Sequence, residues 1–195
     1  MRKLVLEVQM SLDGYIADAD GGTDWMIWKW GPDWKWDSEL QKYHTELTES
    51  VDCILLSRQM AEEGFIDHWQ QVAENRNDPQ YPFAYHITKT HKIVFTRTLT
   101  KSVQIPGGWD NTDIAKGDYI EVINELKNRD GRNIIVYGGA SFVSSLIKAD
   151  LIDEFNLIVN PVTLGNGLSI FNSQQLNLVD ARAFECGIVL LKYSK

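Results

Sequence analysis

Residues 134–146, IIVYGGASFVSSL, constrain the fold of this chain more than any other stretch. The run at 134–137 predicts a short buried strand, and apolar residues then recur at helical spacing (Phe142, Val143, Leu146 and Ile147). A Gly-Gly pair separates the two patterns. Glycine lets a ligand approach the backbone, and the free N–H groups of a helix N-terminus suit phosphate. Alternatively, Gly138 and Gly139 only allow the helix to pack tightly on the strand.

The surroundings of this glycine pair differ from three known motifs. They do not form GxGxxG, they lack the Lys-Ser/Thr of a P-loop, and no glycine follows Ser141 as in a nucleophile elbow. A Walker-type ATPase and a serine hydrolase of that kind are therefore disfavoured.

The length and the net charge of the chain limit the classes of protein to which it can belong. The 195 residues, 44% of them apolar, predict a single domain over 1–195. The net charge of −8 disfavours nucleic-acid and anionic-membrane partners but permits a local basic pocket. No apolar run approaches the roughly 18 residues of a membrane span, so we expect a cytoplasmic protein. Cys53 and Cys186 lie in apolar runs and predict free thiols, and the four histidines lack metal-ligand spacing.

Strand and helix patterns alternate along the chain. Strands are predicted at 3–10, 53–56, 92–96, 134–137, 154–160 and 186–193. Helices are predicted at 39–49 behind a capping pattern at Ser38, after a cap at Ser57, and after a cap at Asp118. Residues 65–91 are predicted to form a surface excursion. The alternation predicts an α/β layer fold with a mostly parallel sheet, and the last two strands, with no helix between them, predict an antiparallel edge.

Residues 17–37 form a tryptophan-rich loop whose spacing fits neither a helix nor a strand. It holds five of the seven tryptophans (Trp25, Trp28, Trp30, Trp34 and Trp36). Five exposed indoles would promote aggregation, so the fold itself, a ligand or a second subunit must cover several of them. We therefore expect a hydrophobic flap, and a homodimer is compatible with it.

Three predicted strands end in residues suited to phosphate. These exits are Ser57-Arg58-Gln59, Thr96-Arg97 and Gly138-Gly139-Ala140-Ser141. Arginine pairs with phosphate oxygens in bidentate fashion, although one arginine after a strand is typical of a solvated surface. Because ligands gather at the carboxyl ends of such strands, three exits together indicate an extended nucleotide across the sheet edge. A cation at the adenosine end would favour NADP over NAD.

Several segments then match one family in order: SLDGYIA, LLSRQM, KIVFTRTL, IIVYGGASF and LIDEF…PVTLGNGLSIF. Together they resemble bacterial proteins similar to the C-terminal reductase domain of the riboflavin-biosynthesis deaminase/reductase (RibD), which share the dihydrofolate reductase fold. The resemblance covers nearly the whole chain. It implies a three-layer fold with a central, mixed and mostly parallel eight-stranded sheet flanked by helices, and NADPH as hydride donor.

The resemblance also implies site residues. Gly138, Gly139, Ala140 and Ser141 look like the turn that holds the diphosphate and nicotinamide, a turn whose Gly-Gly peptide is cis in dihydrofolate reductases. Arg58 and Gln59 match a second phosphate-contacting turn, Thr96 and Arg97 match a pair at the adenosine 2′-phosphate, and Ala17 would lie by the nicotinamide. Two residues depart from the family. Ser57 replaces a glycine and adds a side chain at the cofactor turn, and Met60 replaces a threonine and removes a hydroxyl donor to phosphate, so both are expected to weaken cofactor binding.

Hydride transfer to a C=N bond also needs a proton to reach the nitrogen. The resemblance implies a carboxylate that fixes the substrate ring, on the helix after the tryptophan-rich loop, and another acid near the site after the first strand. The candidates are Asp37 and Glu39, on either side of Ser38, and Asp13 after the first strand. Helical periodicity does not choose between Asp37 and Glu39, because both lie off the apolar stripe on opposite sides. Alternatively, each stabilises the helix dipole by about 0.3–1 kcal/mol, and Asp13 only forms a turn.

The sequence therefore predicts an NADPH-dependent reductase of a small heterocycle, pterin- or dihydrofolate-like or a ribosylaminopyrimidine. No cluster of Arg or Lys stands near the flap to hold a ribityl phosphate, which favours a pterin-like ligand. The alternative is a non-catalytic nucleotide- or ligand-binding protein that retains the fold.

Overall fold

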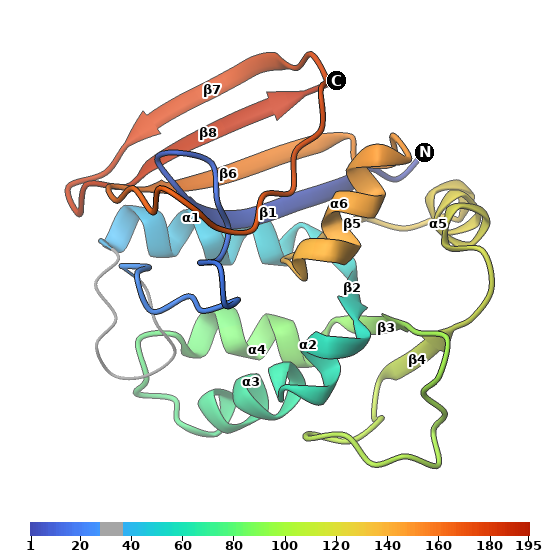
Figure 1. Cartoon of the computed structure of the whole chain (residues 1–195). Helices are drawn as coiled ribbons and strands as arrows, with labels where there is room; N and C mark the ends of the chain where they lie inside the picture. Colours follow the sequence, from blue (N-terminus) through green and yellow to red (C-terminus); the bar gives the residue numbers. More distant parts are fainter. Residues whose placement is uncertain (28–36) are drawn as a thin grey trace.

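The computed structural model describes residues 1–27 and 37–195. Within these residues, eight strands form one sheet in the order β4-β3-β2-β5-β1-β6-β8-β7 (Figure 1). The strands are β1 Leu4–Ser11, β2 Val51–Ser57, β3 His91–Phe95, β4 Thr112–Ala115, β5 Asn133–Val136, β6 Glu154–Asn160, β7 Asn177–Ala183 and β8 Val189–Ser194. Neighbours from β4 to β6 run parallel, while β8 is antiparallel to both β6 and β7. The predicted mixed, mostly parallel sheet is confirmed.

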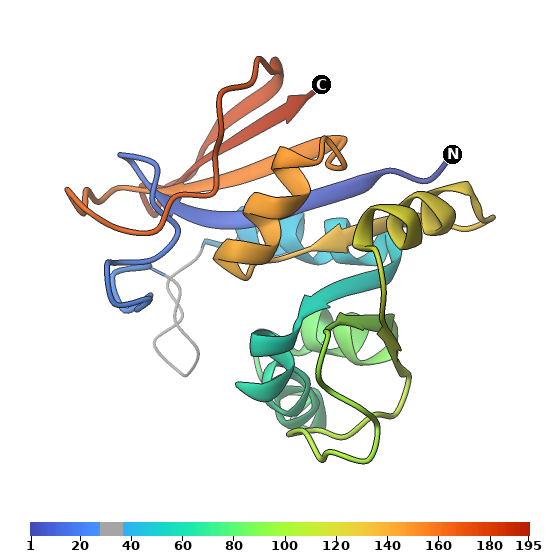
Figure 2. The same cartoon turned by 45° about the vertical axis from the view of Figure 1, so that its right-hand side comes forward.

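Helices cover both faces of this sheet and make three layers (Figure 2). They are α1 Ser38–Glu49, α2 Arg58–Glu62, α3 Phe65–Glu74, α4 Tyr81–Lys89, α5 Tyr119–Asn128 and α6 Ala140–Lys148. On one face, α5 and α6 bury Ile123 and Leu146 in a core with Leu6 of β1. On the other, α3 and α4 bury Trp69 and Phe83 in a second core. Burial of one such side chain contributes about 1.5–3 kcal/mol.

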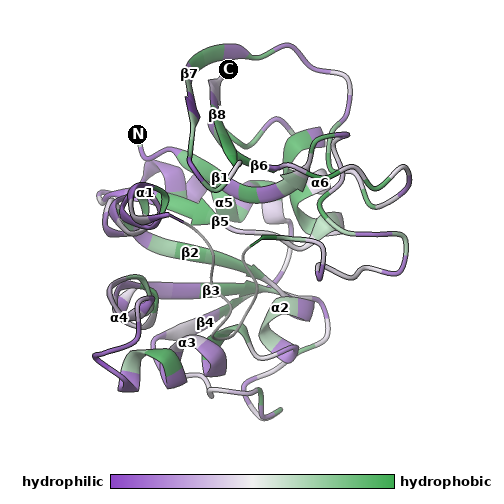
Figure 3. Cartoon of the chain, turned by 90° about the vertical axis from the view of Figure 1, so that its left-hand side faces the viewer, coloured by the Kyte–Doolittle hydropathy of each residue, from purple (hydrophilic) through white to green (hydrophobic). Residues whose placement is uncertain are grey.

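The hydropathy of the strands follows their place in the sheet. Every residue of β1 is buried, whereas every residue of the edge strand β7 is exposed. Figure 3 shows mainly hydrophobic residues along β2 and β5 in the middle of the sheet. Among the described residues, no helix is both long and apolar enough to cross a membrane.

The structure corrects several predicted elements. Residues 65–91 do not form a surface excursion, because α3 and α4 lie there and bury Trp69 and Phe83. Pro82 did not prevent a helix, since it stands in the first turn of α4, where proline is tolerated. The strand predicted at 186–193 starts only at Val189, after a turn. Strands β4 and β7 were not predicted.

The predicted caps are correct at two of three helices. The Ser57 Oγ accepts from Met60 N at the start of α2, and the Asp118 side chain accepts from Ile120 N at the start of α5. At α1 the cap is Asp37 and not Ser38, because the Asp37 carboxylate accepts from Leu40 N at 2.8 Å.

Candidate functional site

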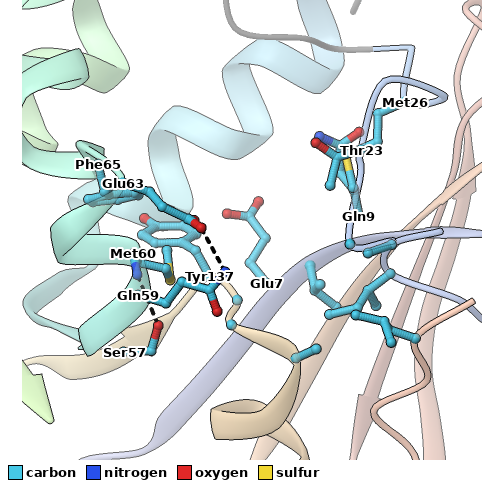
Figure 4. A pocket seen from close by; sticks show the side chains of 18 of the residues that line it. Glu7, Gln9, Thr23, Met26, Ser57, Gln59, Met60, Glu63, Phe65 and Tyr137 are labelled. Carbon is cyan, nitrogen blue, oxygen red and sulfur yellow. Dashed lines mark hydrogen bonds between the residues drawn. The ribbon is translucent and has the colours of Figure 1, made fainter. Parts of the chain in front are cut away.

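A cavity of about 620 Å³ opens beside the carboxyl ends of β2 and β5 (Figure 4). Its walls come from β1, the loop at 16–26, helices α1 to α4, and the turns after β2 and β5. Four aromatic side chains contribute to its lining: Phe65, Trp69, Phe83 and Tyr137. Because β2 and β5 are neighbours in the sheet, the two turns that follow them meet at this cavity.

Gly139 lies in contact distance of Ser57. A Cβ atom at Gly139 would lie 2.8 Å from the Ser57 Oγ, and the φ of Gly139 is +84°, which favours glycine. Gly139 is also the N-cap of α6 and offers no side-chain hydrogen bond to it, so the first N–H groups of α6 carry no side-chain cap at this position. A Cβ at Gly138 would have no atom within 4 Å. The glycine turn therefore combines close packing on one side with open space on the other.

Of the proposed cofactor residues, six line the cavity. They are Ala17, Ser57, Gln59, Gly138, Gly139 and Ala140. The Ala17 carbonyl accepts from Leu168 N at 2.9 Å, and Gln59 Nε2 donates to Glu63 Oε1 at 2.6 Å. The other four, Arg58, Thr96, Arg97 and Ser141, lie outside the lining.

These four residues still lie along the same edge of the sheet, because β3, β2 and β5 are consecutive neighbours. Arg58 is exposed and its Nε lies 3.4 Å from a Glu62 carboxylate oxygen. The Thr96 hydroxyl accepts from the N–H groups of Thr98 and Leu99 at 3.1 and 3.0 Å, so it holds the turn after β3. Arg97 and Ser141 are exposed.

The three predicted acids lie elsewhere, since none lines the cavity. Asp37 caps α1, and Glu39 is exposed. Asp13 accepts hydrogen bonds from Ser11 Oγ and from two backbone N–H groups of residues 164 and 165. The Ser11 hydroxyl first, and then the N–H of residue 165, lower the pKa of Asp13 to about 2. All three acids therefore lie outside the lining, and the carboxylates of Asp37 and Asp13 accept hydrogen bonds from nearby groups of the chain.

A buried carboxylate that the sequence reasoning missed does line the cavity. Glu7 on β1 is 2% exposed, and its Oε1 accepts from His44 Nδ1 of α1 at 2.8 Å. The His44 ring stacks on Phe83 with ring centroids 3.8 Å apart. Two signals were available in the sequence: an acid inside an apolar strand, and the four-residue spacing of Leu40, His44 and Thr48, which places them on one face of α1.

Tyr137, directly after β5, forms a hydrogen bond to Thr48 of α1. Its hydroxyl lies 2.8 Å from the Thr48 Oγ1, which itself donates to the His44 carbonyl at 3.1 Å. Tyr137 is therefore the donor to Thr48. Burial, followed by the negative charge of Glu7, raises the pKa of Tyr137 well above its usual value. The phenol stays protonated, and its ring forms a wall of the cavity (Figure 4).

Part of the tryptophan-rich loop borders the cavity through Thr23, Asp24 and Met26. The indole of Trp25 donates to the carbonyl of residue 22 at 3.2 Å. The other tryptophans of the predicted flap, Trp28, Trp30, Trp34 and Trp36, lie outside the described residues.

The structure also tests two other expectations, a cis peptide in the glycine turn and free cysteine thiols. Every peptide bond of the described residues is trans, so the cis Gly138–Gly139 peptide implied by the resemblance is not present. Cys53 and Cys186 are free thiols, as predicted, and burial raises the pKa of Cys53 to about 12. The described residues include no group of three His, Cys, Asp or Glu side chains placed to hold a metal ion.

The chain is thus an α/β protein whose mostly parallel sheet carries, at its carboxyl edge, a cavity walled by a glycine turn and a helix start. Residues 2–190 match the model of the RibD C-terminal domain, and the chain belongs to that family.

Two relatives come from Bacillus subtilis (strain 168). The chain is 32% identical over 199 residues to "Uncharacterized protein YyaP", covering 98% of this chain and 94% of that protein. It is 30% identical over 195 residues to "Uncharacterized protein YwjB", covering 94% and 92%.

Solved structures share the fold over the whole chain. A "Putative riboflavin biosynthesis protein" from Shewanella sp. PV-4 matches with a TM-score of 0.67 and 24% identity, covering 100% of this chain and 98% of that one. The Saccharomyces cerevisiae "Riboflavin Biosynthesis Reductase Rib7" matches with a TM-score of 0.58 and 15% identity, covering 99% and 89%. The RibD-type, dihydrofolate reductase-like fold predicted from the sequence is confirmed.

Proposed function

We propose that this protein is an NADPH-dependent reductase that transfers a hydride to a small heterocycle. The observation that carries the proposal is the meeting of two turns, one at Ser57 and one at Gly138–Gly139, on the wall of an aromatic-lined cavity. Membership of the RibD C-terminal family and likeness to a protein named a riboflavin biosynthesis reductase support the same class of activity.

The residues along the sheet edge fit a dinucleotide. The first N–H groups of α6 carry no side-chain cap from Gly139, and the space beside Gly138 is open, so a diphosphate oxygen can approach both. Exposed guanidinium groups follow at Arg58, after β2, and at Arg97, after β3. An extended molecule that starts at the glycine turn would therefore reach Arg97 at its far end. When bound, NADPH supplies the hydride.

The chain's own residues would orient the substrate and exclude water. The ring centroids of Phe65 and Phe83 lie 6.2 and 6.1 Å from that of Tyr137, and the three rings give the cavity flat apolar walls. Such walls suit a planar ring, and they remove water from the place where the ring meets the nicotinamide. Thr23 and Met26 bring the described part of the tryptophan-rich loop to the same cavity.

Binding of the two nicotinamide cofactors tests the proposal. We would titrate the protein with NADPH and with NADH and follow quenching of tryptophan fluorescence. We expect NADPH to bind more tightly, and Arg97→Ala to weaken NADPH at least about 10-fold with little effect on NADH, because a charge-assisted contact to a phosphate is lost. Arg76→Ala, which also removes an exposed guanidinium, is the matched control.

Two outcomes would contradict the proposal. Failure of both nucleotides to bind would exclude hydride transfer from a nicotinamide, and an equal loss in both arginine variants would remove the role of Arg97. Oxidation of NADPH in the presence of dihydrofolate or a pterin then separates a reductase from a protein that binds without turnover.

We also propose a homodimer, with tryptophans of the loop at its interface. Sedimentation of Trp28 and Trp34 variants tests it, and a mass unchanged from wild type would remove these tryptophans from the interface.

A further inference from the structure

The carboxylate of Glu7 is incompletely satisfied. A buried carboxylate is costly unless hydrogen bonds or charges compensate it. Its Oε1 is held by His44, whereas its Oε2 is buried and has no hydrogen-bond partner among the described residues. Figure 4 shows the Glu7 side chain directed into the cavity, between Tyr137 on one side and Gln9 on the other. Oε2 of Glu7 therefore lacks a hydrogen-bond donor and belongs to a side chain that lines the cavity, where a ligand would supply that donor.

The charged side chains of the described residues that line this cavity are all acidic. Among the described residues that line it, Glu7, Asp24 and Glu63 are acidic, and no lysine or arginine joins them. The exposed Arg58 and Arg97 lie along the sheet edge, outside the lining. A phosphate within the cavity would meet these carboxylates with no compensating cation from the described lining residues, which therefore favour N–H donors there.

Resting on the proposed function, we propose that Glu7 anchors the substrate and selects a planar heterocycle that carries a ring N–H beside an amino group and no phosphate. Two parallel N–H donors match the two oxygens of a carboxylate. Oε2 has both of its lone pairs open, and Oε1 accepts from His44 and keeps one more. His44 is the positioning residue, because its stack on Phe83 and its bond to Oε1 fix the direction of the carboxylate.

A purely structural role is the competing explanation, since the Glu7–His44 pair also joins β1 to α1. Stability alone cannot separate the two, so the readout must be selectivity between ligands. Guanosine, inosine and guanosine 5′-monophosphate provide that readout. Guanosine carries the ring N–H and the adjacent amino group, inosine lacks only the amino group, and the monophosphate adds only the anionic group.

The experiment is calorimetric titration of these three probes into the wild-type protein and two variants. We expect wild type to bind guanosine about 10- to 100-fold more tightly than inosine and also more tightly than the monophosphate, because an unpaired carboxylate oxygen is costly. Glu7→Gln should bring the guanosine-to-inosine ratio close to one. Glu63→Gln removes an equal charge from the lining and should keep the ratio, which makes it the matched control.

Several results would overturn the inference. They are an inosine affinity equal to that of guanosine in wild type, tighter binding of the monophosphate, no binding of guanosine, or an equal loss of selectivity in Glu63→Gln. The wild-type comparison needs no variant, so it decides the matter even where Glu7→Gln fails to fold. NADPH titration of the same samples is independent: its failure would refute the proposed reductase, whereas the probe series would still decide the role of Glu7.

Discussion

The two glycines of the turn after β5 should respond to the same substitution in opposite ways. Gly139→Ala forces a left-handed φ on alanine, which costs about 1–2 kcal/mol, and places a Cβ 2.8 Å from the Ser57 Oγ, which costs about 1–3 kcal/mol more. We expect the free energy of unfolding to fall by about 2–5 kcal/mol. Gly138→Ala meets no atom within 4 Å and should change it by less than about 0.5 kcal/mol.

For NADPH affinity, the proposed function of the turn predicts the opposite order, with the larger effect from Gly138→Ala. The methyl of Gly138→Ala enters the open space where the proposed diphosphate approaches, so NADPH affinity should fall although the fold is intact. Urea unfolding followed by circular dichroism gives the stabilities, and fluorescence titration gives the affinities.

A double-mutant cycle identifies the cause of the Gly139→Ala effect. Ser57→Gly alone removes the α2 cap at a cost of a few tenths of a kcal/mol, and it also removes the side chain that Gly139→Ala would meet. On the Ser57→Gly background, Gly139→Ala should therefore cost only the backbone part, about 1–2 kcal/mol. The same cost on both backgrounds, or a Gly139→Ala variant as stable as Gly138→Ala, would refute this explanation of the turn.

Three further predictions concern charged groups. Burial lowers the pKa of Lys92 to about 8, so the unfolded chain holds more protons between pH 8 and 10.5 and stability should rise across that window by roughly 3 kcal/mol. Lys92→Met should flatten the rise in urea unfolding at several pH values, and the exposed Lys89→Met should not. Asp37→Ala should lower stability by about 1 kcal/mol through loss of the α1 cap without changing NADPH affinity, whereas Glu39→Ala should change stability by less than about 0.5 kcal/mol. The lowered pKa of Asp13 means that its stabilising contribution is present above about pH 4 and is lost as the pH falls toward 2, so Asp13→Asn should remove that acid dependence from thermal unfolding curves.

The parts of the fold that depend on local signals could be predicted from the sequence. The strand at 154–160 agrees residue for residue with β6, and the caps at Ser57 and Asp118 lie where their sequence patterns indicate. Local signals failed for β7, because an edge strand exposed at every position has no alternation of apolar and polar residues. They failed for α3 and α4, because Pro79 and Pro82 indicate a loop when the helix boundaries are unknown.

The candidate site, too, could be predicted from the sequence only where it depends on local signals. The glycine turn could be predicted, because strand, turn and helix are adjacent in sequence. The pair of Glu7 and His44 could not, because it joins residues 37 positions apart and exists only when α1 packs against β1. Asp37 and Glu39 are candidates because of their place at a helix start, but an acid at a helix start can also serve only to accept from the free N–H groups of the helix, as Asp37 does.

The place of β1 in the sheet bears on how the chain is made. Of the eight strands of this sheet β1 is synthesised first, yet its partners β5 and β6 lie at residues 133–160. All eight of its residues are buried in the finished protein, so this apolar segment must wait in the nascent chain until most of the polypeptide has been synthesised. Folding is therefore dominated by late, non-local pairing, and a chain cut short before β6 would leave one side of β1 open to aggregation or to chaperones.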